Sequence, residues 1–318
     1  MRAIAIVDDQ LVWQESPTPE PGPGQVRVHV AAAGVNRADL VQRAGRYPPP
    51  PGASPILGLE VSGVVDAVGP QTTTAVGTPV CALLTGGGYA EQVVVEEACC
   101  LPVPDGVDLV DAAALPEVWA TVWLNLVGEA ALAAGERLVV HAGASGVGTA
   151  AIQLASLLGA RTFVTAGSTD KIARCTALGA EEGWVRHDGE WAPAVERWAG
   201  GADVILDPVG GPYLAQAQQV LATDGRWVLI GLMGGRSAPV DLGRLLIKRQ
   251  RLIGSTLRAR SVARKARVLA QLETTVWPAI ADGRVRTVIE ARWPIREADQ
   301  AHRQLQSNDT VGKILLTL

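Results

Sequence analysis

The positions of apolar residues divide the chain into a strand-rich first part and a later part in which strands alternate with helices. In the first part, short stretches alternate apolar and polar residues or run apolar, and glycines separate several of them. The strands predicted there are 1–7, 25–35, 61–69, 78–84 and 89–95. Short strands at this spacing are typical of a barrel-like β domain.

Two proline-rich segments interrupt this first part. Residues 16–24 read as a turn-rich connector between strands. Residues 45–55 contain too many prolines for a helix or an inner strand, because proline lacks the N–H donor and fixes φ. We expect a surface loop at 45–55, and long loops of this kind often carry functional residues.

Between Arg137 and Gly254 strands alternate with helices. Apolar side chains from Val147 to Leu158 recur on one helical face. A second helix is predicted from Thr169, with this threonine in the capping position. The strands predicted around these helices are 137–141, 161–165, 202–207 and 226–231. Such alternation predicts an α/β fold with a parallel, doubly wound sheet.

After Ser255 the pattern is helical again and then ends on an apolar stretch, 312–318, which is a predicted strand. A strand so late in the chain could return to the first domain.

The composition allows a large buried core, since 48% of the residues are hydrophobic and 19% are charged. A net charge of −4 argues against a dedicated nucleic-acid binder. Residues 242–272 are the exception, because they hold nine Lys and Arg residues and no acid. This basic stretch is either a solvated face with helix-end charges or a surface that attracts an anionic ligand or partner.

From the sequence we expect neither a targeting segment nor a membrane span. Acids at Asp8 and Asp9 interrupt the N-terminal apolar stretch, and no apolar run approaches the ~20 residues that span a membrane. The cysteines, Cys81, Cys99, Cys100 and Cys175, form no C-x-x-C pair. Their spacing fits neither a disulfide framework nor a zinc site. We therefore expect free thiols and a cytoplasmic location.

A glycine-rich turn between a predicted strand and a predicted helix is the first candidate site. Gly143, Gly146 and Gly148 allow a tight turn whose N–H groups approach a pyrophosphate at the helix N-terminus. Ser145 occupies the middle position of the usual G-x-G-x-x-G pattern, which is a departure from it. Turns that bind no ligand also use glycine, so the context of strand and helix matters.

The end of the next predicted strand indicates which dinucleotide is bound. A cofactor with a free ribose 2′-hydroxyl calls for an acid there, but Ala166, Gly167 and Ser168 occupy the place. Ser168, Lys171 and, near the same corner, Arg186 suit a 2′-phosphate. Lys171 could instead be an ordinary solvated helix lysine. We expect NADPH to be preferred over NADH.

Several long strings resemble one known family. They are 32–65, 116–123, 141–155, 224–235 and 311–318. They are similar to the zinc-free quinone oxidoreductases of the medium-chain dehydrogenase/reductase superfamily, above all to the tumour-suppressor-inducible NADPH:quinone oxidoreductase branch of animals and its bacterial relatives. The resemblance covers essentially the whole chain, in order.

This resemblance implies two domains. A GroES-like β-barrel domain is expected from 1–117 and 256–318, and a Rossmann cofactor-binding domain from 118–255, with a cleft at their junction. Family members are usually homodimers or homotetramers that pair through the cofactor domain, so we expect a homodimer or a tetramer.

The resemblance also implies that no metal is bound. Asn36 stands where the zinc-containing branch has its first cysteine ligand, and Leu59 stands where it has a histidine. Leucine cannot ligate zinc and asparagine is a poor ligand. The four-cysteine structural lobe is missing. The four histidines are not grouped like a metal site, and each is expected to be structural or on the surface. They are His29, His141, His187 and His302.

Family positions then suggest roles for individual residues. Asn36 and Tyr47 are expected beside nicotinamide and substrate, with Ser145 near the nicotinamide ribose. Asn36 could instead only cap the helix that follows it, and Tyr47 could be a plain loop residue. The other residues expected at the cofactor are Thr121, Gly143, Ala144, Gly146, Val147, Gly148, Gly167, Gly231, Leu232, Met233 and Lys313.

Three further residues are weaker candidates. Asp39 could orient Asn36 or the loop. Trp119 and Trp123 could line the cleft, although tryptophans more often pack in a core. Among the cofactor candidates, Lys313 could equally be a solvated terminal lysine.

We expect NADPH to pass hydride to a small-molecule quinone, which stabilises the arriving charge on its own oxygens, with no metal. One alternative is reduction of α,β-unsaturated carbonyls, alkenals or enoyl thioesters, in which Tyr47 could donate the proton. The other is an NADPH-binding protein with a structural or RNA-binding role, which only the basic stretch supports.

Overall fold

The computed structural model describes all residues, 1–318, and the chain forms two compact units. The β-rich unit consists of Met1–Ala120 and Leu257–Leu318, and the α/β unit of Thr121–Thr256. No helix is both long and apolar enough to cross a membrane.

A seven-stranded sheet organises the β-rich unit. The strand order is β14-β15-β3-β4-β5-β7, and β6 also pairs with β3. The bounds are β3 Gln25–Val35, β4 Glu60–Val68, β5 Pro79–Leu83, β6 Gln92–Glu96, β7 Cys100–Pro102, β14 Ile289–Pro294 and β15 Lys313–Thr317. A separate hairpin, β1 Arg2–Val7 with β2 Gln10–Glu15, precedes it. The GroES-like β architecture expected from the sequence is therefore present.

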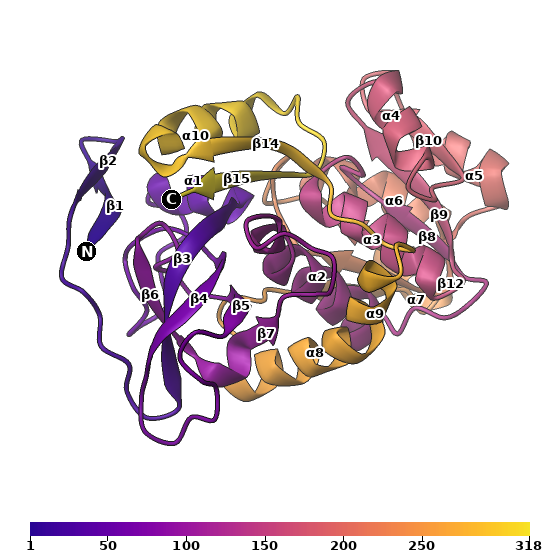
Figure 1. Cartoon of the computed structure of the whole chain (residues 1–318). Coiled ribbons are helices and arrows are strands. Elements are labelled where there is room, and N and C mark those ends of the chain that lie inside the picture. Colours follow the sequence, from indigo (N-terminus) through magenta and orange to yellow (C-terminus); the bar gives the residue numbers. More distant parts are fainter. The chain divides into compact units, whose positions relative to one another are not determined.

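The last strand returns to the first part of the chain. β15 pairs antiparallel with β3, and the pair Ile314 and Val35 brings Lys313 next to the end of β3. Helix α10 (Ala298–Ser307) packs against β14 and β15, as the yellow ribbons of Figure 1 show. The strand β14, which pairs parallel to β15, is not predicted from the sequence.

Further helices complete the β-rich unit. They are α1 (Arg37–Arg43), α8 (Val262–Thr275) and α9 (Trp277–Ala281), and α2 (Pro116–Val122) begins in it. The 3₁₀ helices are η1 (Glu97–Cys99), η2 (Asp111–Ala114) and η5 (Ile295–Glu297). Ala32, Ala113, Ala114 and Leu315 form a small apolar cluster where η2 meets the sheet.

A six-stranded parallel sheet with flanking helices forms the α/β unit, in the order β10-β9-β8-β11-β12-β13. The strands are β8 Arg137–Val140, β9 Arg161–Ala166, β10 Glu182–Val185, β11 Ala202–Asp207, β12 Leu221–Leu229 and β13 Arg251–Gly254. The helices are α3 Gly146–Leu157, α4 Thr169–Thr176, α5 Ala192–Ala199, α6 Leu214–Val220 and α7 Leu242–Ile247, with η3 Trp123–Glu129 (a π-helix) and η4 Gly211–Tyr213. This is the predicted doubly wound Rossmann architecture.

Two details differ from the sequence predictions. The N-cap of α4 is Ser168, whose hydroxyl accepts from the Lys171 N–H, and Thr169 is the first helical residue. The basic stretch is not a uniform solvated face, because Arg258 and Lys265 are 5% and 3% exposed. Both side chains are anchored inside the β-rich unit.

Candidate functional site

The glycine turn of the α/β unit is tightly packed between β8 and α3. Ser145 caps α3 by accepting from the Gly148 N–H at 3.0 Å. A Cβ on Gly148 would lie 2.4 Å from the carbonyl oxygen of Gly143, and one on Gly143 would lie 2.7 Å from Cβ of Val164. Only glycine fits these two positions, so the helix start and the strand end approach each other closely.

The second strand end is basic and open. The Arg186 N–H donates to the carbonyl oxygen of Ala166, which brings Arg186 beside Gly167. A Cβ on Gly167 would come no closer than 3.9 Å to the guanidinium of Arg186. Ser168 and Lys171 begin α4 at the same corner, with Asp170 in the first turn of that helix. The structure thus groups Gly167, Ser168, Lys171 and Arg186.

A buried histidine lies beneath the end of β9. His141 shares a hydrogen bond of 3.0 Å with the hydroxyl of Thr165, and its ring contacts Trp191 and Tyr213 edge-on at centroid distances of 4.5 and 4.6 Å. Burial lowers the pKa of His141 to about 3, so the ring is neutral at physiological pH. His141 therefore supports the strand ends as a structural residue.

The residues expected over the nicotinamide ribose lie on a loop after β12. The Met233 N–H donates to the carbonyl oxygen of Pro208, and Gly231 packs so closely on Pro208 that a Cβ would lie 2.7 Å from it. Asp207 holds the preceding turn through the N–H groups of Val209 and Gly210. Leu232 and Met233 project outward and are about half exposed.

In the β-rich unit, Asn36 belongs to a buried polar cluster. Its Nδ2 donates to Glu60 Oε1 at 2.9 Å and, more weakly, to the carbonyl oxygen of Gly34 at 3.3 Å. Its Oδ1 accepts from Lys313 Nζ at 2.7 Å, and Lys313 Nζ lies 2.6 Å from Glu60 Oε1. The sequence did not single out Glu60, although it directly follows Leu59 at the position discussed for zinc.

Backbone around Glu60 is shaped to hold its carboxylate. Glu60 Oε2 accepts from the Glu117 N–H at 2.8 Å, and the residue is fully buried. A Cβ on Gly34 would lie 2.2 Å from Glu60 Oε1, so only glycine leaves room there.

Asp39 connects the start of α1 to a second buried network. It accepts from the N–H groups of Asn36 and Gly58 and from the hydroxyl of Tyr89, which also contacts His302 Nε2 at 3.1 Å. Burial raises the pKa of Asp39 to about 6 and lowers the pKa of His302 to about 4. Asp39 thus holds the backbone N–H of Asn36. This contact agrees with the suggestion from the sequence that Asp39 could orient Asn36.

Tyr47 on the proline-rich loop lies against a buried arginine. The Arg258 guanidinium carbon is 5.2 Å from the centroid of the Tyr47 ring, and Arg258 Nε donates to the carbonyl oxygen of Thr85. Lys265 donates to the hydroxyl of the same threonine at 3.0 Å. Desolvation raises the pKa of the half-buried Tyr47, so its hydroxyl stays protonated at physiological pH. Sequence reasoning missed Arg258 because it sits in the basic stretch.

The remaining candidates are buried in their own units. Trp119 and Trp123 are 2% and 6% exposed, which agrees with the core-packing alternative. Thr121 is nearly buried, and its carbonyl oxygen accepts from Asn125 Nδ2.

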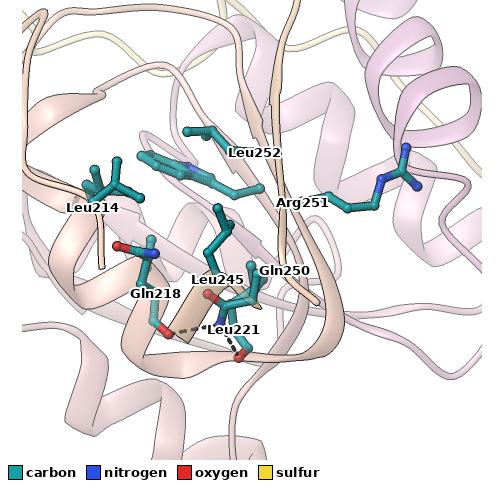
Figure 2. Close-up of a pocket in the computed structure, with 10 residues that line it drawn as sticks. Leu214, Gln218, Leu221, Leu245, Gln250, Arg251 and Leu252 are labelled. Atoms are coloured by element: carbon teal, nitrogen blue, oxygen red, sulfur yellow. Dashed lines mark hydrogen bonds between the residues drawn. The ribbon is translucent and has the colours of Figure 1, made fainter. Parts of the chain in front are cut away.

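A small pocket lies elsewhere on the α/β unit, away from the glycine turn. Its lining comes from α6, α7, β12 and β13 and includes Leu214, Gln218, Leu245, Gln250 and Leu252, drawn in Figure 2. Gln250 closes one side by donating to the carbonyl oxygens of Gln218 and Leu221. The pocket contains none of the predicted site residues.

Comparisons with known proteins cover both units. A family model described as the alcohol dehydrogenase GroES-like domain matches residues 22–105, and one described as zinc-binding dehydrogenase matches residues 146–272. The quinone oxidoreductase of Thermus thermophilus, solved also with NADPH, is 31% identical with a TM-score of 0.86. The mycobacterial protein Rv1454c complexed with NADPH is 29% identical with a TM-score of 0.89. In both comparisons all of each chain is covered.

Curated relatives include much longer proteins. The mycocerosic acid synthase-like polyketide synthase of Mycolicibacterium smegmatis is 32% identical over 312 residues, which is 97% of this chain and 15% of that protein. The polyketide synthase GfsB of Streptomyces halstedii is 34% identical over 297 residues, 93% of this chain and 5% of that protein. This chain spans less than a fifth of these relatives.

Proposed function

Because the chain belongs to the medium-chain dehydrogenase/reductase superfamily, we propose that it is an NADPH-dependent reductase that transfers hydride to a quinone without a metal. The observation that carries the proposal is the basic corner at Gly167, where the end of β9 carries no acid, next to a tight glycine turn. The resemblance to the tumour-suppressor-inducible branch and the quinone oxidoreductase neighbours support quinones as the substrate class.

The residues present fit NADPH. Gly143 and Gly148 place no side chain at the two tightest points of the turn, so N–H groups at the start of α3 can approach a pyrophosphate. Ser168, Lys171 and Arg186 supply a hydroxyl and two cations for a 2′-phosphate, around a Gly167 that leaves space. We assign the pyrophosphate contacts to 143–148 and the nicotinamide ribose to Ser145, Thr121 and 231–233.

Zinc fits poorly, although one matching family model is named for it. Asn36 and Leu59 supply no thiolate or imidazole, and the chain contains no group of three or more His, Cys, Asp or Glu residues that could hold a metal ion. At this place the ammonium of Lys313 contacts both Asn36 and Glu60. These residues support a reaction that needs no metal.

When bound, NADPH supplies the hydride. One N–H of the Asn36 amide makes only a long hydrogen bond, 3.3 Å, to the carbonyl oxygen of Gly34. This N–H can instead donate to an oxygen of the substrate as negative charge develops there. Tyr47 keeps its proton at neutral pH, because its pKa is raised, and offers a second donor. Arg258 holds the loop that carries Tyr47 and lies against its ring. The one proton that the hydroquinone needs besides the hydride can also come from water.

Initial rates across acceptors test this proposal. With NADPH, we expect 9,10-phenanthrenequinone or naphthoquinones to be reduced faster than 2-alkenals and 2-enoyl thioesters. The absence of turnover with every quinone, beside turnover of an enoyl thioester, would reverse the assignment.

A second candidate function is reduction of enoyl thioesters, which the matches to polyketide synthases favour. That reaction needs a proton donor for the substrate α-carbon, and Tyr47 is the candidate. Replacement of Tyr47 by Phe should lower kcat for an enoyl thioester by about 10²–10⁴-fold, the usual contribution of a general acid. Quinone reduction should fall by less than about tenfold, since water can supply the proton. Equal losses for both substrates would refute this role of the hydroxyl.

Cofactor selectivity provides a test of the basic corner. Replacement of Lys171 by Ala should raise the KM for NADPH by about 10–100-fold, because a charge-assisted hydrogen bond is worth about 1.5–3 kcal/mol. The KM for NADH should not change. The control is Arg197→Ala, which removes an exposed cation from the end of α5. A parallel rise for both cofactors in Lys171→Ala would contradict the assignment.

We further propose that the chain forms a homodimer through the α/β unit and is cytoplasmic. β13 is an edge strand, and Leu242, Leu246 and Ile247 on α7 are more than 70% exposed. Replacement of Leu246 and Ile247 by Glu should halve the molar mass measured by light scattering. Val76→Glu, at an isolated exposed apolar residue of the β-rich unit, should not. An unchanged mass for the α7 variant would contradict this interface.

The RNA-binding alternative is weakened, since Arg258 and Lys265 are buried.

A further inference from the structure

The first residue of the last strand is a buried lysine. Lys313 is 4% exposed, although lysine is rarely buried because its ammonium is strongly hydrated in water. Its Nζ lies 2.9 Å from the carbonyl oxygen of Val35, 2.7 Å from Asn36 Oδ1 and 2.6 Å from Glu60 Oε1. Three acceptors therefore meet the three N–H donors of the ammonium.

This ammonium dictates how the Asn36 amide is turned. An ammonium can only donate and an ionised carboxylate can only accept. Lys313 therefore selects the oxygen of the amide, and Glu60 selects its nitrogen. With both partners in place the amide has one orientation, and without the cation its oxygen would have no donor to hold it.

The carboxylate of Glu60 is the buried counter-charge of this ammonium. Glu60 keeps its full carboxylate in the core, and Gly34 and the Glu117 N–H make room for it and hold it. A buried carboxylate needs a positive partner, and Lys313 is the cation that contacts it.

We propose that Lys313 is a positioning residue, whose buried ammonium fixes the Asn36 amide for the reaction. The inference rests on the proposed function. It also differs from the role suggested by the sequence resemblance, in which Lys313 binds the cofactor.

Three variants separate positioning from simple ion pairing. Lys313→Met and Glu60→Gln each leave one charge unpaired in the core, whereas the double variant removes both charges. Replacing a whole buried ion pair is often neutral for stability, so the double variant should melt at a higher temperature than either single variant. Its Tm controls for folding.

The rates should not follow the stabilities. We expect kcat for quinone reduction to fall about 100-fold in Lys313→Met and in the double variant, the effect of a misplaced reacting group. KM for NADPH should stay within about threefold of the wild-type value, because substitutions away from the cofactor change its binding little. Glu60→Gln leaves the contact between the Lys313 ammonium and Asn36 in place. Its kcat should therefore fall less than that of the double variant, although the double variant is more stable.

The alternatives give different patterns. A double variant with the kcat of the wild type would overturn the proposal and leave a structural ion pair. A large rise in KM for NADPH with unchanged kcat would also overturn it and support cofactor binding by Lys313. Failure of the wild type to reduce any quinone would instead overturn the proposed function. Hydrogen exchange of the Asn36 amide tests the role of Lys313 without any turnover.

The chain contains three asparagines, Asn36, Asn125 and Asn308. Selective ¹⁵N labelling of asparagine therefore gives three side-chain amide nitrogens, each with a pair of proton signals, and the pair lost in Asn36→Asp identifies Asn36. We expect slow hydrogen exchange for this amide in the wild type and fast exchange in the double variant. Equally slow exchange in both proteins would refute the positioning role whatever the substrate is.

Discussion

Alanine at Gly34 is expected to destabilise the protein by about 3–5 kcal/mol, the range for breaking a buried ion pair. The new Cβ would lie 2.2 Å from Glu60 Oε1, 2.6 Å from Cδ and 2.7 Å from Cγ. The whole carboxylate would have to leave its place. Lys313 would then lose its counter-charge inside the core, and the Asn36 amide would lose the acceptor of its Nδ2 group.

Urea unfolding monitored by circular dichroism measures this loss. A double-mutant cycle isolates its cause, because Glu60→Ala removes the atoms that Gly34→Ala would strike. Alanine at position 34 should add little further destabilisation in that background. If Gly34→Ala costs as much in the Glu60→Ala background as in the wild type, the collision with the carboxylate is not the reason.

Alanine at Gly148 should have the second large effect. Its Cβ would lie 2.4 Å from the carbonyl oxygen of Gly143 and 2.5 Å from that of Ala142. Both are backbone atoms, so α3 would have to move away from the turn. We expect a loss of about 1–3 kcal/mol in stability, as for other overpacked sites. NADPH affinity should fall by more than about tenfold, since the turn's N–H groups would no longer converge on one anion.

NADPH titration by fluorescence, together with thermal unfolding, tests this expectation. The matched control is Gly254→Ala in β13, where no atom lies within 4 Å of the added Cβ. The control should bind NADPH like the wild type. Unchanged affinity in Gly148→Ala would mean that the dinucleotide does not bind at this turn.

Much of the fold could be predicted because its central elements have a regular apolar pattern. β8, β9, β11 and β12 carry apolar side chains between helices, which the central strands of a parallel sheet require. β10 and β13 escape prediction because they lie at the two edges of the sheet, with polar and exposed positions. Edge strands bury fewer side chains, so their sequences need fewer apolar residues and show a weaker apolar pattern.

The candidate site shows a different limit. The glycine turn and the Gly167 corner are local in sequence, so spacing alone can predict their residues. Lys313 and Asn36 are 277 residues apart, and only the pairing of β15 with β3 brings them together. Glu60 follows an apolar stretch, where a carboxylate ordinarily signals the surface. Its burial depends on the absence of a side chain at Gly34, which no local pattern reports.

The central claim is that hydride passes from NADPH to a conjugated acceptor without help from a metal. The most direct measurement is the initial rate of NADPH oxidation with a quinone, before and after exhaustive chelation, with metal content determined on the same sample. The account predicts an unchanged rate in metal-free protein and no stimulation by added zinc. A rate that disappears on chelation and returns with one equivalent of zinc would contradict it.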